Sequence, residues 1–131
     1  MDRRFFLSLL PAFPLASQQS GPPPRARTVA TIPLPAPYEG QTATLVELNL
    51  AAGEASSAPH RHPGFVLGFV MEGEFRFQIA GSPERVLRAG ESFYEPPGSQ
   101  HLVSASASPT SAARVLAIVI AASGLAITEP L

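Results

Sequence analysis

The sequence contains no cysteine, and all nine of its basic residues are arginine, so lysine is absent as well. Without cysteine the chain can form no disulfide, no thiolate metal site and no cysteine nucleophile. Without lysine it can form no Schiff base with a carbonyl substrate. Its net charge of −1 provides no basic surface, so we expect no nucleic-acid partner.

The chain is long enough for one hydrophobic core. Its composition predicts an ordered domain, and its pattern of short strands predicts an all-β one. It has 131 residues, of which 45% are hydrophobic and 15% are charged, which suits a single small domain. Short segments with β periodicity alternate with turns rich in glycine and proline, as in sandwiches and barrels. The run 65–71 is apolar throughout except for Gly68, so we expect a strand buried on both faces. The predicted strands are 41–50, 65–71, 74–79, 85–88, 90–96 and 113–122.

The first 37 residues predict an export signal followed by an extended arm. Arg3 and Arg4 precede an apolar run at 5–16, which is shorter than the roughly 20 residues needed to cross a bilayer. Residues 1–20 therefore resemble a cleavable signal, of a type similar to the twin-arginine pattern. We expect a periplasmic or secreted protein with no membrane anchor after cleavage. An uncleaved tail on a cytoplasmic protein is the alternative.

Residues 21–37 are rich in proline, which is typical of a linker or an edge arm. The part 28–34 is apolar enough to add an edge strand, because proline is tolerated there. The globular domain is then expected to occupy residues 38–131.

All three histidines of the chain lie in two short motifs, 60–64 and 96–101. Side chains of a strand repeat their direction every second residue, so His60 and His62 should point to the same side. His101, on a neighbouring strand, would complete a set of three imidazoles. Three such ligands with an open position are typical of a catalytic metal site. The alternative is that the histidines are solvated, or are satisfied within a core.

Segments 53–73 and 90–101 resemble the two sequence motifs of the cupin superfamily. The second segment matches the glycine, proline and histidine spacing of that motif throughout. The resemblance implies a single cupin domain, an RmlC-like jelly-roll barrel of antiparallel strands. It further implies one divalent transition metal, either iron, zinc, nickel or manganese, held by His60, His62 and His101.

The sequence departs from the family pattern at two positions. Where cupins usually carry a metal-binding glutamate, this chain has Val66, which cannot bind a metal. Where an asparagine often follows the last histidine, it has Ala105. The resemblance therefore carries over the three histidines alone.

Glu95 is the candidate that could replace the missing carboxylate. Strand alternation groups Phe93 with Glu95 on one face and Ser92 with Tyr94 on the other. An inward carboxylate is costly unless it is paired, hydrogen-bonded or bound to a metal. Glu95 is therefore expected to be a fourth metal ligand, or a catalytic general base beside the metal. In the third alternative it turns outward or pairs with an arginine.

Two functional classes follow from these residues. The first is a metal-dependent enzyme acting on a small, anionic or chelating molecule, of the dioxygenase, isomerase or decarboxylase class seen among small cupins. The second is a module that binds a metal or a small ligand without turnover, which the missing glutamate at Val66 favours. Small cupins commonly pair their barrels, and the apolar edge at 28–34 could add to a neighbouring sheet, so we expect a homodimer.

Overall fold

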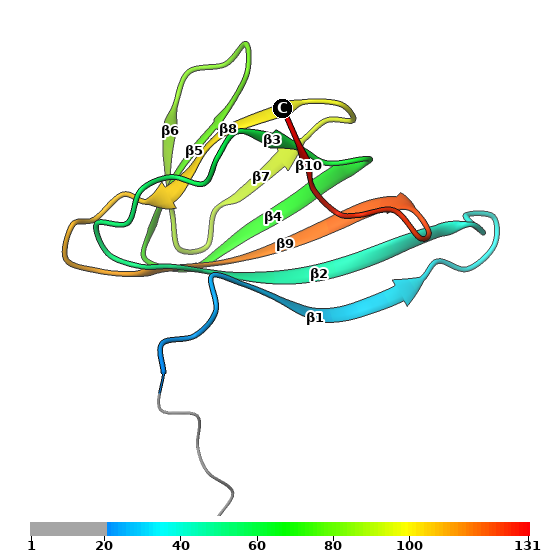
Figure 1. Ribbon diagram of the computed structural model, residues 1–131, viewed down its shortest axis with the longest axis horizontal. Helices are drawn as coiled ribbons and strands as arrows, with labels where there is room; N and C mark the ends of the chain where they lie inside the picture. The colour runs from blue at the N-terminus through cyan, green and yellow to red at the C-terminus, as the bar shows by residue number, and fades with distance from the viewer. Residues whose placement is uncertain (1–20) are drawn as a thin grey trace, which may run out of the picture.

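The computed structural model describes residues 21–131, which form two antiparallel five-stranded sheets packed face to face (Figure 1). One sheet has the order β1-β2-β9-β4-β7 and the other the order β10-β3-β8-β5-β6. This arrangement confirms the prediction of an all-β jelly roll. The export signal expected at 1–20 lies outside the described residues. The strands are β1 (Ala26–Pro33), β2 (Gln41–Leu50), β3 (His60–Arg61), β4 (Phe65–Glu72), β5 (Glu74–Ile79), β6 (Arg85–Arg88), β7 (Ser92–Glu95), β8 (Gln100–Ser106), β9 (Ala113–Ala122) and β10 (Glu129–Pro130).

The core between the sheets is built around three phenylalanines. Phe75 and Phe77 alternate with exposed or half-buried polar residues along β5, so both rings point inward. Phe93 of β7 meets them from the opposite sheet, with its ring centroid 4.7 Å from that of Phe77 and 5.4 Å from that of Phe75. Aromatic pairs at these separations add favourable contacts beyond the area that they bury. The ring of His101 lies against this cluster, with its centroid 5.1 Å from that of Phe77, so the aromatic core borders the site.

The expectation that segment 65–71 is buried on both faces is wrong. Val66 and Val70 are fully buried, whereas Leu67 and Phe69 are 47% and 45% exposed. The strand alternates because only its inner side meets the second sheet, and no other part of residues 21–131 covers the outer side. Together with residues on the same face of neighbouring strands, these side chains form the outer apolar face, defined here by Ile32, Leu67, Phe69 and Tyr94.

The proline-rich arm is integrated into the fold. The predicted edge strand is present as β1, which pairs with β2 along its whole length and has an irregularity between Thr28 and Ala30. Arg25, immediately before this strand, reaches the interior of the barrel. Within the described part of the chain no helix is long and apolar enough to cross a membrane.

Candidate metal centre

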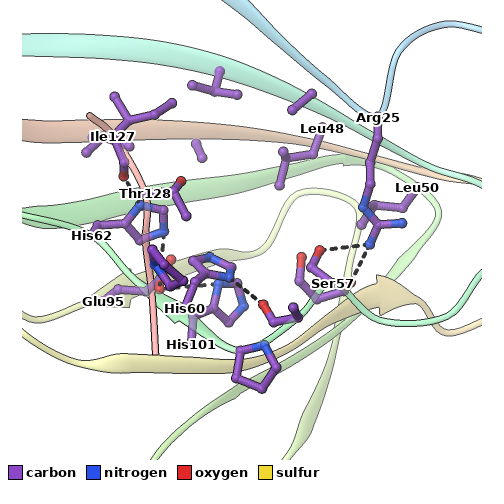
Figure 2. A pocket seen from close by; sticks show the side chains of 18 of the residues that line it. Arg25, Leu48, Leu50, Ser57, His60, His62, Glu95, His101, Ile127 and Thr128 are labelled. Carbon is purple, nitrogen blue, oxygen red and sulfur yellow. Dashed lines mark hydrogen bonds and ion pairs between the residues drawn. The ribbon is translucent and has the colours of Figure 1, made fainter.

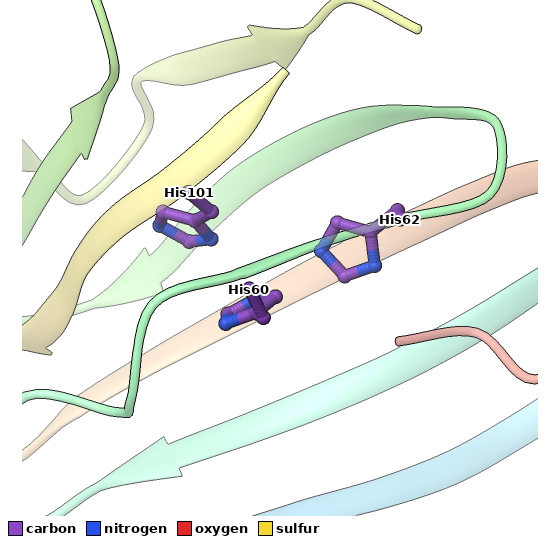
Figure 3. A group of neighbouring side chains, drawn as sticks. All are labelled: His60, His62 and His101. Atoms are coloured by element: carbon purple, nitrogen blue, oxygen red, sulfur yellow. The ribbon is translucent and has the colours of Figure 1, made fainter. Parts of the chain in front are cut away.

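The three histidines meet at one end of the barrel interior (Figure 3). His60 of β3 pairs directly with His101 of β8, and His62 is the first residue after β3. The ring centroid of His60 lies 5.0 Å from those of both other histidines. One nitrogen from each ring lies within 4.8 Å of the other two. The structure therefore brings together the three residues that the motif spacing singled out.

Two tight local geometries hold the motifs in place. Gly98 has a φ of 75°, which glycine adopts without strain, and Ser99 closes the turn by donating its backbone N–H to Pro96 O at 3.1 Å. This turn places the end of β7 beside the start of β8. Gly64 closes the first motif where the chain passes close to β9, and a Cβ there would lie 1.8 Å from the Ile120 carbonyl oxygen. Only glycine fits at that crossing.

Each imidazole donates one ring N–H to a backbone carbonyl. His60 Nδ1 donates to Ala58 O at 2.9 Å, His62 Nδ1 to Ile127 O, and His101 Nε2 to Val103 O at 2.8 Å. Such bonds fix which nitrogen keeps a lone pair and are typical of metal-ligating histidines. The available lone pairs are consequently those of Nε2 in His60 and His62, and of Nδ1 in His101.

Burial keeps the deeper imidazoles neutral. It lowers the pKa of His62 below its usual value and lowers the pKa of His101 to about 4. Desolvation disfavours the imidazolium form, so these rings retain the unprotonated nitrogen that a metal requires.

Glu95 points into the same space, as strand alternation predicted. Its side chain is 3% exposed, whereas that of Tyr94, the preceding residue, faces outward and the residue is 50% exposed. The Glu95 carboxylate oxygen Oε1 lies 3.4 Å from His101 Nδ1 and 3.9 Å from His62 Nε2. Burial raises the pKa of the Glu95 carboxyl to about 7. The alternative in which Glu95 turns outward is therefore wrong.

The donor set fits a metal ion. Within residues 21–131, Glu95 Oε1 is buried and has no hydrogen-bond partner, an arrangement that costs free energy unless another group satisfies the oxygen. Ligands about 2.0–2.1 Å from a tetrahedral ion lie about 3.3 Å from one another. The 3.4 Å from Glu95 Oε1 to His101 Nδ1 is close to that spacing, and the 3.9 Å to His62 Nε2 is longer. A cation beside His101 Nδ1 and His62 Nε2 would satisfy the carboxylate oxygen and these two lone pairs. Within residues 21–131, the group of donor atoms that lie within 4.8 Å of one another comprises the three histidines alone.

The register of β4 and β7 explains how a carboxylate reaches the site without the usual glutamate. Val66 pairs directly with Glu95 in this ladder, and both side chains are buried on the inner face. Directly opposed residues in antiparallel strands have Cβ atoms about 4.5–5.5 Å apart. Glu95 thus enters the site from the strand beside the one that carries Val66.

A cavity of about 400 Å³ opens from the histidines into the barrel (Figure 2). We name the three histidines together the histidine cluster. Three alternate residues of β2, here named the β2 wall, face this cavity, and Ala117 and Val119 of the neighbouring β9 extend the apolar surface. The β2 wall consists of Val46, Leu48 and Leu50.

Sequence reasoning missed two contributors to the cavity, Arg25 and the strap formed by residues 127–130. Arg25 lies at the opposite end of the cavity from Glu95 (Figure 2) and pairs with Glu54 at 2.7 Å. The strap pairs with β3 through Glu129 and Pro130, and its Ile127 carbonyl holds His62. No local pattern marks either segment, because each reaches the site only through long-range pairing.

Residues 46–119, more than half of the chain, match the family model of the cupin domain. The chain belongs to the cupin family. No curated protein matches it.

Solved structures share this cupin fold at low sequence identity. A protein with a double-stranded β-helix domain from Klebsiella pneumoniae has a TM-score of 0.60 and 20% identity, over 86% of this chain and 89% of its own. A cupin-like protein from Thermotoga maritima has a TM-score of 0.57 and 24% identity, over 68% and 64%. The DMSP lyase DddQ from Ruegeria pomeroyi has 0.55 and 22%, over 70% and 43%. These likenesses establish the fold.

Proposed function

We propose that this cupin binds one divalent transition-metal ion through its histidine cluster, with Glu95 as the fourth ligand. The observation that carries the proposal is the gathering of three imidazole nitrogens within 4.8 Å of one another, beside a buried Glu95 oxygen that lacks a hydrogen-bond partner within residues 21–131. That oxygen lies 3.4 Å from His101 Nδ1 and 3.9 Å from His62 Nε2. Imidazole and carboxylate donors suit iron, zinc, nickel and manganese.

We further propose that the site acts on a small molecule, as an enzyme of the dioxygenase, isomerase or decarboxylase class. A bound metal would supply Lewis-acid chemistry or activate oxygen. Three neutral imidazoles and one carboxylate leave a divalent ion with net positive charge, which favours an anionic or chelating ligand.

The second candidate is a cupin that holds a metal or ligand without turnover. The valine at position 66, where the family usually has a metal-binding glutamate, favours it. The two candidates share the metal site and differ in whether a bound ligand is converted to product.

Metal analysis after removal of metals with a chelator and reloading tests the shared site. Wild type incubated separately with iron, zinc, nickel and manganese should retain about one ion per chain with at least one of them. The double variant His60→Ala with His62→Ala should retain none, because two of the three imidazole ligands are lost. Arg61→Ala is the matched control, since Arg61 lies between the two histidines in the same motif. A folded wild-type protein that binds none of the four metals would overturn the proposed function.

A further inference from the structure

The cavity is strongly divided between a polar end and an apolar body. At one end lie the histidine cluster and Glu95. The β2 wall leads away from them, with its side chains on alternate residues of one strand. The first and last members of the wall are four positions apart, so at about 3.3 Å per residue it runs for about 13 Å. Phe93 and Ile127 add further apolar surface to the cavity.

Among residues 21–131, the cation at the opposite end of the cavity is Arg25, and it is already paired. The Arg25 guanidinium pairs with Glu54 at 2.7 Å and donates to Ser57 Oγ and to the Ser104 carbonyl, each at 2.9 Å. Arg25 therefore joins the arm to the loop before β3. A compact molecule with an anionic group at each end would therefore meet an available positive charge only at the metal.

We propose that the ligand of this site is a small amphipathic molecule, with one oxygen-bearing chelating group and an apolar body. The chelating group would meet the metal at the histidine cluster, and the apolar body would lie along the β2 wall. This inference rests on the proposed metal site and specifies its ligand class. A purely hydrophilic ligand would leave the wall in contact with water and would gain nothing from it.

The energetic consequence is a dependence of affinity on the length of the apolar body. Each methylene group that leaves water for an apolar surface tightens binding by about fourfold. The gain should continue while the ligand extends along the β2 wall, and it should level off once the body is longer than the wall.

Straight-chain hydroxamates test this dependence, because they keep the chelating group constant while the apolar body grows. Zinc-loaded protein would be titrated calorimetrically with acetohydroxamate, butyrohydroxamate, hexanohydroxamate and octanohydroxamate. Affinity should rise by about fourfold per added methylene up to the limit of the wall. The metal-free protein should bind octanohydroxamate at least about tenfold more weakly, since the chelating group has no partner there.

Leu48→Gln is the decisive variant, and Leu45→Gln is its matched control on the same strand. Leu48 faces the cavity, whereas Leu45 lies on the opposite face of β2. Leu48→Gln should weaken octanohydroxamate binding by about tenfold and leave acetohydroxamate binding unchanged. Leu45→Gln should change neither. Val46→Thr, which nearly conserves volume, serves as a second wall variant if Leu48→Gln does not fold.

The outcomes separate this inference from the proposed metal site. A flat hydroxamate series on protein that carries zinc would overturn the amphipathic ligand while leaving the metal site intact. Equal binding of octanohydroxamate to zinc-loaded and metal-free protein would also overturn the amphipathic ligand. In that case the chelating group would not be bound at the histidine cluster. Failure of wild type to load zinc or any other of the metals would instead overturn the proposed function.

Discussion

Replacing Glu95 by leucine should change the stability of the metal-free protein and its metal affinity in opposite directions. The Glu95 carboxylate is buried, and its Oε1 has no hydrogen-bond partner within residues 21–131. A buried polar group in that state costs about 1–3 kcal/mol. Leucine has a similar size and no polar atom, so the free energy of unfolding should rise by about 2 kcal/mol. Metal binding should weaken by about tenfold to 100-fold or more. Losing a group that only supports a ligand already weakens binding by that range.

Two unfolding measurements test both signs. In the presence of a chelator, guanidinium unfolding should show the higher midpoint for Glu95→Leu, and its thermal midpoint should rise by about 8 °C. At a zinc concentration of about 100 times the wild-type Kd, wild type should gain about 2.7 kcal/mol. With binding that is tenfold to 100-fold weaker, the variant should gain only about 0.4–1.4 kcal/mol at the same zinc concentration. The advantage of the variant should therefore shrink from about 2 kcal/mol without metal to about 0.7 kcal/mol or less with it.

The control for this experiment is Glu74→Leu, because Glu74 is an exposed glutamate of β5. Its free energy of unfolding should change by no more than about 0.5 kcal/mol in either condition. A Glu95→Leu protein that is less stable than wild type in chelator would refute the reasoning about the unpartnered carboxylate. Unchanged zinc affinity would refute the assignment of Glu95 as a ligand.

Two further predictions concern the strap and the outer apolar face. Deleting residues 124–131 removes the Ile127 carbonyl that orients His62, so zinc affinity in a competition titration should fall by about tenfold to 100-fold. By reciprocity, zinc should slow hydrogen exchange in the strap, and unchanged affinity or exchange would contradict the coupling. We also expect a homodimer through the outer apolar face, whose four residues are each 45–50% exposed, in an interface of roughly 800 Å² per partner. Light scattering at tens of micromolar should give a dimer mass for wild type and a monomer mass for Phe69→Glu, and a wild-type monomer would count against the expectation.

Local periodicity was sufficient to predict most of the strands. The predicted segments 41–50, 74–79, 85–88 and 113–122 coincide with β2, β5, β6 and β9, because period-two alternation and the intervening glycine and proline turns are local properties. The burial of 65–71 was predicted wrongly for a physical reason. An apolar residue such as Phe69 shows only that burial would be favourable, and whether another layer covers it depends on the rest of the fold.

The centre of the site was predictable and its periphery was not. Motif spacing and the direction of strand side chains are enough to gather the histidine cluster and to turn Glu95 inward. The partners that complete the site are remote in sequence. His62 bonds to a carbonyl 65 residues away, and Arg25 bonds to one 79 residues away. No pattern within a short window relates such positions, so only the folded chain identifies them.

The pairing of Val66 with Glu95 shows why a sequence motif can suggest a lost ligand when the fold supplies another. A motif assigns chemistry to a position along one strand, whereas a metal responds to where a donor atom lies in space. In the β4–β7 ladder these two residues are direct neighbours on the same inner face, so a carboxylate on either strand enters the same volume. Valine at one position fills the core beside a glutamate at the other. The valine at position 66 therefore does not mean that the site lacks a carboxylate, because Glu95 supplies one. Whether the site supports turnover then depends on Glu95.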